Sequence, residues 1–276
     1  MRNTAKITAA VLATGGLTLG LAACGSENGS GSANADGPLI VAASPTPHAD
    51  ILTYVKDKLA KKEGLDLEVK EFTDYVQPNT ATQDGSVGAN FFQHKPYLDD
   101  FNKKNGTDLV WVNDVHLEPL GLYSKKAKKA DELANGATVA LPNDTTNEGR
   151  ALKLLDANGI IKLKADAGLD ATPADIAENP KNLKFKEIEA AQLPRSLGDV
   201  DAAVINGNYA VEAGLSPKKD ALVSETAKGN PYANGLVVKK GQENDPRVKK
   251  LAKLLNSEEV RKYIDDKFDG AVEPAF

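Results

Sequence analysis

The chain has 276 residues, with 34 lysines and arginines against 39 aspartates and glutamates, so its formal net charge is −5. This acidic balance argues against nucleic-acid binding, and the length allows one large domain or two smaller ones. The single cysteine, Cys24, excludes an intrachain disulfide and any metal cluster built on several cysteines.

The N-terminal segment has the pattern of an export signal. Arg2 and Lys6 precede a stretch of small and apolar residues, which at about 17 residues is shorter than the roughly 20 that a spanning helix needs. It ends in Leu21-Ala22-Ala23-Cys24, which resembles the bacterial lipobox, whose cysteine is acylated before cleavage. We therefore expect a signal peptide over residues 1–23 and lipidation of Cys24. An ordinary secretory signal followed by a free thiol is the alternative.

The segment after Cys24 predicts a flexible tether. Residues 25–37 contain no large apolar side chain and cannot bury enough surface to form a core. We expect residues 24–37 to connect a folded domain to a lipid anchor at the membrane surface. Removing Arg2 and Lys6 with the signal leaves 32 basic against 39 acidic residues, a net charge of −7.

The next part of the chain alternates strand and helix patterns. Leu39 to Ala43 is a short apolar run, typical of a buried parallel strand, and Ile51, Leu52, Val55 and Leu59 follow at helical spacing. Residues 65–72 alternate like a half-buried strand, which completes a βαβ unit. We expect a helix to begin within 74–79, followed by a strand over 89–92, a helix over 96–104 and a strand over 109–115.

The same alternation continues to the end of the chain. Further strands are predicted over 138–142, 183–188, 202–205 and 236–238, and helices over 147–158, 209–213, 248–255 and 260–268. This pattern predicts an α/β fold with two lobes. If the chain crosses between lobes around 118–122 and 232–236, the first lobe comprises residues 38–118 plus 235–276 and the second comprises 119–234, with a hinged cleft between them.

Catalytic motifs are scarce. His48, His94 and His116 are too far apart in sequence for a metal-binding helix of the HExxH type, and neither a Gly-x-Ser-x-Gly elbow nor a phosphate-binding loop is present. We therefore expect no catalytic residue, no metal site and no cofactor.

Polar residues that directly follow strands are more informative, because open α/β sheets bind ligands there. Asn143 to Arg150 offers helix-capping groups and a guanidinium that suits a carboxylate, although Arg150 could equally pair with a nearby acid. Asn206 could bind a zwitterion or form an Asn-Gly turn with Gly207. In Asn90 to Tyr97, Phe91 and Phe92 should point in opposite directions, one toward the core and one toward an apolar slot.

These features and their surroundings resemble the methionine-binding lipoproteins of ATP-driven methionine importers, the NlpA-type lipoproteins. The resemblance covers nearly the whole domain after the tether. It rests on TDYVQPN (73–79), ANFFQHKPYLD (89–99), HLEPLGLYSKK (116–126), VALPNDTTNEGRAL (139–152), ENPKNLKFKEIEAAQLPRSL (178–197), AVINGNYA (203–210) and NPYANGLVVK (230–239).

The resemblance implies a type II periplasmic-binding fold, with two α/β lobes, two hinge crossings and a ligand between the lobes. It also implies a role for individual residues. Arg150 would bind the methionine carboxylate, and Asn206 and Asn234 its ammonium and carboxylate groups. The methionine side chain would lie among Tyr75, Phe92 and His94, with Tyr97 and Asn147 as further candidates.

The resulting hypothesis is a lipid-anchored, monomeric receptor on the extracytoplasmic face of the cell membrane. It would bind L-methionine and deliver it to an ABC permease driven by its ATPase subunit. One alternative is a lipoprotein of the same fold that binds another small amino acid, a methionine peptide or an organic anion. The others are a surface hydrolase that uses a cleft residue such as His94 or His116, and a scaffolding lipoprotein with a degenerate pocket.

Overall fold

The computed structural model describes residues 37–227 and 229–276. The predicted signal peptide, Cys24 and nearly all of the predicted tether lie outside the described residues. Within the two described ranges, no helix combines the length and the apolar character that crossing a bilayer requires.

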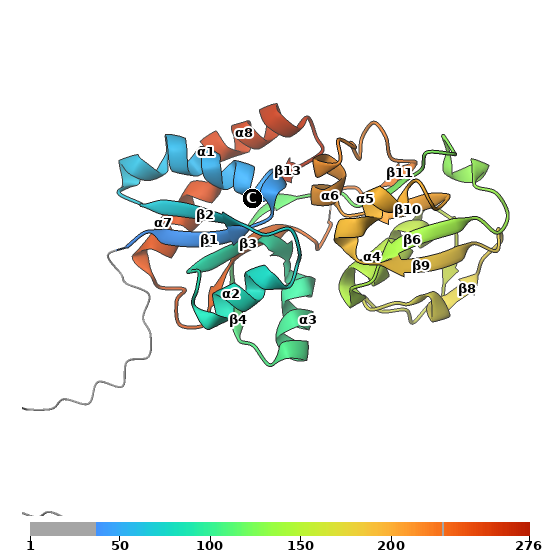
Figure 1. Ribbon diagram of the computed structural model, residues 1–276, viewed down its shortest axis with the longest axis horizontal. Coiled ribbons are helices and arrows are strands. Elements are labelled where there is room, and N and C mark those ends of the chain that lie inside the picture. The colour runs from blue at the N-terminus through green and yellow to red at the C-terminus, as the bar shows by residue number, and fades with distance from the viewer. Residues whose placement is uncertain (1–36, 228) are drawn as a thin grey trace, which may run out of the picture. The chain divides into compact units, whose positions relative to one another are not determined.

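The first of two main sheets has six strands in the order β13-β4-β12-β3-β1-β2 (Figure 1). β1 pairs in parallel with both β2 and β3, which confirms the predicted βαβ unit, and β12 lies antiparallel between β3 and β4. The bounds are Leu39–Ala43 for β1, Leu67–Glu71 for β2, Ala89–His94 for β3, Leu109–Leu117 for β4, Asn234–Lys239 for β12 and Glu273–Pro274 for β13.

Helices cover both faces of this sheet. Figure 1 shows α1 and α8 on one face and α2 and α3 on the other. Ile51 and Leu52 of α1, with Leu251 of α7 and Ile264 of α8, belong to the largest apolar cluster, which packs against β1 and β3. The bounds are Asp50–Lys58 for α1, Gln77–Asp84 for α2, Lys95–Asn105 for α3, Pro246–Leu255 for α7 and Glu258–Phe268 for α8.

The second main sheet has five strands in the order β11-β5-β10-β6-β9. Its central strands β10, β6 and β9 are parallel, and β5 is antiparallel to both β10 and β11. The strands are β5 (Gly121–Tyr123), β6 (Thr138–Pro142), β9 (Lys184–Ile188), β10 (Ala202–Ile205) and β11 (Val223–Ser224), and the helices are α4 (Thr145–Ala157), α5 (Leu193–Ser196) and α6 (Gly207–Glu212). β7 (Lys162–Leu163) and β8 (Ile176–Glu178) form a separate two-stranded sheet.

Short helical turns connect several of these elements. They are a π-helical turn over Pro45–Ala49, between β1 and α1, and 3-10 turns over Ala60–Glu63, Ala130–Glu132, Pro173–Asp175 and Ala190–Gln192. The first of them places His48 in the core, where its side chain is fully buried.

The chain passes between the two main sheets twice. It leaves the first sheet after β4 and enters the second at β5, so residues 118–120 form the first passage. It returns to the first sheet between the end of β11, at Ser224, and the start of β12, at Asn234. Each sheet has its own apolar clusters.

The structure differs from the predicted elements mainly at their ends. The helix expected within 74–79 begins only at Gln77, because the Asp74 carboxylate accepts hydrogen bonds from the backbone N–H groups of Val76 and Gln77. The helix expected to begin at Tyr209 starts at Gly207. The sequence pattern did not indicate β5, β11 or β13, because strands of two or three residues are too short to show alternation.

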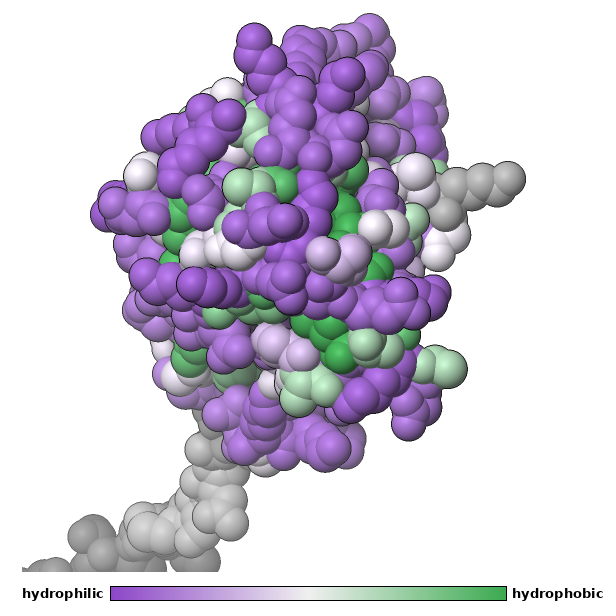
Figure 2. All heavy atoms as spheres, turned by 90° about the vertical axis from the view of Figure 1, so that its right-hand side faces the viewer, coloured by the Kyte–Doolittle hydropathy of each residue, from purple (hydrophilic) through white to green (hydrophobic). Residues whose placement is uncertain are grey.

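The face of the protein that Figure 2 shows is mainly hydrophilic. Val76 and Leu169 are the large apolar side chains that remain exposed in the described part of the chain. Isolated exposed residues of this kind do not form a docking patch.

Candidate functional site

One cavity collects all of the predicted ligand-binding side chains. The cavity is small: its empty volume, counted together with the solvent at its mouth, is about 320 Å³. Strands of the first sheet, helices and loops beside both main sheets, and the first passage contribute residues to its lining. They are Tyr75, Phe92, Gln93, His94, Tyr97, Glu118, Asn147, Arg150, Asn206, Asn208 and Asn234.

Three aromatic rings form the apolar side of the cavity. The centroid of the Tyr75 ring lies 5.9 Å from that of Phe92 and 5.8 Å from that of Tyr97. Phe91, the neighbour of Phe92 on β3, instead packs in the core of the first sheet, so the two residues point in opposite directions as predicted. Such a wall suits an apolar or thioether side chain.

Two hydrogen bonds connect the aromatic side to neighbouring elements. The hydroxyl of Tyr75, which lies in the segment before α2, donates to Asn208 Oδ1 of α6 at 2.5 Å. The Tyr97 hydroxyl donates to the carbonyl oxygen of Tyr75 at 2.9 Å. The first bond holds the Tyr75 side chain against α6, and the second holds the Tyr75 backbone against α3.

His94 is neutral and bridges α3 to α4. Its Nδ1 accepts from the backbone N–H of Tyr97, so the ring proton is on Nε2, which donates to Asn147 Oδ1 at 3.0 Å. Asn147 Nδ2 in turn donates to both carboxylate oxygens of Asp144. Burial, with the nearby positive charge of Arg150, lowers the pKa of His94 to about 3. Both amide atoms of Asn147 are thus occupied, which favours a positioning role for it.

Arg150 of α4 is buried and pairs with an acidic side chain, which was the alternative to ligand binding that the sequence left open. Its Nε and Nη2 donate to the two carboxylate oxygens of Glu225 at 2.8 and 2.5 Å, and Nη2 also donates to the carbonyl oxygen of Glu118. Its guanidinium carbon lies 4.4 Å from the centre of the Tyr232 ring. Nη1 has no hydrogen bond to a described residue and remains available to a ligand carboxylate.

The asparagines supply further free polar atoms. Asn206 precedes α6 without capping it, and its Oδ1 is buried and has no partner among the described residues. Gly207 lies in the first turn of α6 and does not adopt a positive φ, so the Asn-Gly turn did not form. Asn208 Nδ2 is also buried without a partner. Asn234 Oδ1 lies 3.1 Å from His48 Nε2.

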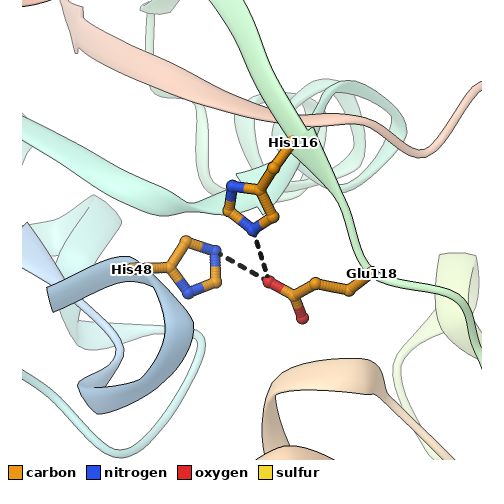
Figure 3. Close-up of side chains that lie close together, drawn as sticks. All are labelled: His48, His116 and Glu118. Carbon is orange, nitrogen blue, oxygen red and sulfur yellow. Dashed lines mark hydrogen bonds and ion pairs between the residues drawn. The ribbon is translucent and has the colours of Figure 1, made fainter. Parts of the chain in front are cut away.

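Glu118 lies in the first passage and meets two histidines from separate elements (Figure 3). Its Oε1 is 2.7 Å from His116 Nε2 and 3.2 Å from His48 Nε2. Burial lowers the pKa of His48 to about 4 and that of His116 to about 3, so both rings are neutral near pH 7. Burial raises the pKa of Glu118, while the positive charge of Arg150 and the backbone N–H of Asn208 oppose that shift.

Comparison with known proteins fits this architecture. A family model described as NlpA lipoprotein matches residues 39–276. The chain belongs to the NlpA lipoprotein family. A curated relative, the methionine-binding lipoprotein MetQ of Bacillus subtilis (strain 168), is 44% identical over 259 residues, which cover 92% of this chain and 93% of the relative.

Solved structures of similar chains confirm the predicted fold class for this NlpA lipoprotein. A nutrient-binding protein from Burkholderia cenocepacia, bound to methionine, superimposes with a TM-score of 0.83 at 47% identity and covers 86% of this chain and 100% of its own. A periplasmic substrate-binding protein of an ABC transporter from Coxiella burnetii gives 0.82 at 43% identity, with 86% and 100% covered. These relatives are named as binding proteins, not as enzymes.

The sequence interpretation of this NlpA lipoprotein missed several residues of the site. Glu118, Asn208 and Gln93 line the cavity, and Glu225 and Tyr232 hold Arg150. Glu118 and Asn208 lie inside the stretches that carry the family resemblance, so closer attention to buried polar positions there could have found them. Glu225 lies outside those stretches, 75 residues after Arg150, and no local pattern announces it.

Proposed function

We propose that this NlpA lipoprotein binds methionine outside the cytoplasm and delivers it to the permease of an ABC importer. The observation that carries the proposal is the two-sided cavity. Three aromatic rings face one part of a ligand, while the Nη1 of Arg150 and unpaired asparagine atoms face another. An amino acid with an apolar thioether side chain fits both sides.

Each predicted site residue has a role in this proposal. Arg150 binds the ligand carboxylate through Nη1, and Asn206 and Asn234 bind the charged groups at the α-carbon. Tyr75, Phe92, His94 and Tyr97 surround the thioether side chain. Asn147 holds His94 in place. The small volume of the cavity favours a single amino acid over a peptide.

The transport role needs a tethered, hinged receptor. We propose that residues 1–23 are a signal peptide, that Cys24 carries the lipid anchor and that residues 24–37 are the tether. Lobe 1, residues 38–118 plus 235–276, and lobe 2, residues 119–234, would close around the ligand. A tether raises the local concentration of a monomeric receptor near its permease.

Calorimetric titration with L-methionine, on protein stripped of any bound ligand, tests the proposal directly. D-methionine, leucine, a methionyl dipeptide and a simple organic anion complete the panel and separate the alternatives. We expect the tightest binding for methionine. Absence of both binding heat and a thermal shift at millimolar methionine would refute the proposal, and tighter binding of another ligand would reassign the substrate. Mass spectrometry of cell-derived protein tests for an acylated Cys24 N-terminus.

A further inference from the structure

Seven lysines gather on adjoining elements that cover the first sheet. Helix α7 packs against α1 and against the 3-10 turn over Ala60–Glu63. Lys250 Nζ donates to the carbonyl oxygen of Gly64 at 3.3 Å, just after that turn, and Lys56 and Lys61 line the same surface hollow. All seven residues are exposed, and we call them the lysine surface: Lys56, Lys58, Lys61, Lys62, Lys249, Lys250 and Lys253.

The lysine surface lacks acidic partners. None of its lysines forms an ion pair within the described ranges, whereas Lys95, Lys104 and Lys262 each pair with an aspartate on their own helix. Helix α7 contains no acidic residue. Lys249 and Lys253 lie one turn apart on it, and like charges at that spacing destabilise a helix. Local costs of this kind are expected where a surface serves a function.

The lysine surface is positive although the protein as a whole is acidic. On α1 and the 3-10 turn, Asp57 and Glu63 are the acids without an ion pair, because Asp50 pairs with Lys267, and Asp66 follows the turn. Seven lysines against these three acids leave an excess of four positive charges, while the whole chain carries a formal net charge of −5. Such an excess attracts a negatively charged surface.

The described chain begins beside the lysine surface. Arg247 Nη1, at the start of α7, donates to the carbonyl oxygen of Gly37 at 3.0 Å, and the backbone N–H of Leu39 donates to that of Asp66 at 2.8 Å. The proposed tether, residues 24–37, therefore joins the domain between α7 and the start of β2. A flexible coil of this length spans about 20 Å on average, so an anchor at its far end would hold the lysine surface close to the bilayer.

The lysine surface and the cavity lie at opposite ends of the same strands. Gly37 lies just before β1, which is parallel to β3, and the cavity residues Phe92 and His94 lie at the carboxyl end of β3. In Figure 1, α7 and the end of α1 lie on the same side of the first sheet as the start of β1. A flat partner that contacts the lysine surface therefore leaves the cavity free.

We propose that the lysine surface docks on the anionic lipid headgroups of the membrane that holds the anchor. The inference rests on the lipid anchor of the proposed function and adds a second, reversible contact to it. Each lysine near an anionic bilayer strengthens the attraction, which fades within about 8 Å at physiological salt. The tether makes docking an intramolecular step, so a weak attraction is sufficient. The docked receptor keeps its cavity turned away from the bilayer.

Lysine labelling on vesicles tests the proposal. Mature protein from cells is reconstituted into vesicles of phosphatidylcholine, either alone or with about 30% phosphatidylglycerol. An amine-reactive label and mass spectrometry then give a labelling rate for each lysine. On the anionic vesicles, the lysine surface should react at least about 3-fold more slowly than on the neutral ones, and about 0.5 M salt should restore its rate. Lys128 and Lys129, which are exposed and have no ion pair in the described chain, serve as internal controls and should not change.

The labelling pattern separates the lipid surface from other occupants. Equal protection on neutral and anionic vesicles would point to a second copy of the chain instead of lipid and would overturn the proposal, as would slower labelling of all lysines alike. If the protein does not stay on neutral vesicles, the proposed anchor fails. Protection of the lysine surface on anionic vesicles then still supports docking, and its absence overturns it.

A matched pair of variants attributes the effect to charge. The first combines Lys249→Gln, Lys250→Gln and Lys253→Gln, and the control combines Lys125→Gln, Lys128→Gln and Lys129→Gln, which removes the same charge from exposed positions before β6. Protection of Lys56 and Lys61 should disappear in the first variant and persist in the control. Both variants should bind methionine like the wild type, because none of these residues lines the cavity. Protection that survives in the first variant would overturn the proposal, and if this variant does not fold, the wild-type pattern decides.

Discussion

Replacing Arg150 with methionine should strongly destabilise the protein, because it leaves the Glu225 carboxylate buried without its partner. The two side chains are only 4% and 12% exposed, and two hydrogen bonds of 2.8 and 2.5 Å join them. Burial disfavours the charged form of both groups, but the charge of each group stabilises the charged form of its partner by more. The pKa of Glu225 is therefore lowered and that of Arg150 raised.

The magnitude follows from this geometry. At about 3 Å and an effective dielectric constant of about 20, the Coulomb attraction is about 5 kcal/mol, and desolvation offsets part of it. Removing one partner of such a pair costs about 3–5 kcal/mol. Glu225→Gln should cost less than Arg150→Met, because an amide oxygen can still accept from the backbone N–H of Leu120.

The double variant measures the pair itself. In Arg150→Met with Glu225→Gln, neither of these two positions carries an unpaired buried charge, so we expect the double variant to be about 2 kcal/mol more stable than the sum of the single effects predicts. Urea unfolding of ligand-free proteins, followed by circular dichroism, gives all four free energies of unfolding. A loss below about 1 kcal/mol for Arg150→Met, or additive effects in the double variant, would show that water solvates this pair and would refute the reasoning.

Three further predictions concern binding and stability. Gly207→Ala should weaken methionine binding at least about 10-fold, because the added Cβ would collide with Glu118. Gly198→Ala is the control, since a Cβ added there would meet no atom within 4 Å. Calorimetric titration compares the two variants. Tyr75→Phe, which removes the bond to Asn208, should weaken binding by about 1 kcal/mol, and an unchanged dissociation constant would contradict this. Stability should fall as the pH drops below about 6.5, because burial lowers the pKa values of His48, His94 and His116 to about 3 to 4 in the folded protein. The histidines of the unfolded chain therefore take up protons first, which favours unfolding. Each unit of pKa difference between the two states corresponds to about 1.4 kcal/mol. Burial raises the pKa of Glu118 and of Asp144, and raises that of Glu148 to about 7, and these shifts act in the opposite direction. A melting temperature that rises from pH 7 to pH 5 would show that the carboxyl groups outweigh the histidines.

The sequence by itself determined the regular elements and the positions where polar residues follow strands. Apolar runs and helical spacing are local properties, so β1, α1 and β3 could be predicted from neighbouring residues. The polar residues after β3, β6 and β10 could be found for the same reason, and all eight predicted site residues line one cavity. Alternation along β3 also determined that Phe91 and Phe92 point in opposite directions.

Only the tertiary structure decided which charges meet. His48 and His116 looked unrelated in sequence, yet the turn before α1 and the end of β4 bring both to Glu118 (Figure 3). Glu225 pairs with Arg150, which lies 75 residues earlier in the sequence. Such pairings depend on how distant elements pack, and no local periodicity encodes them. For the same reason the sequence indicated where a ligand could bind, while the arrangement of buried charge came from the packing of the two sheets.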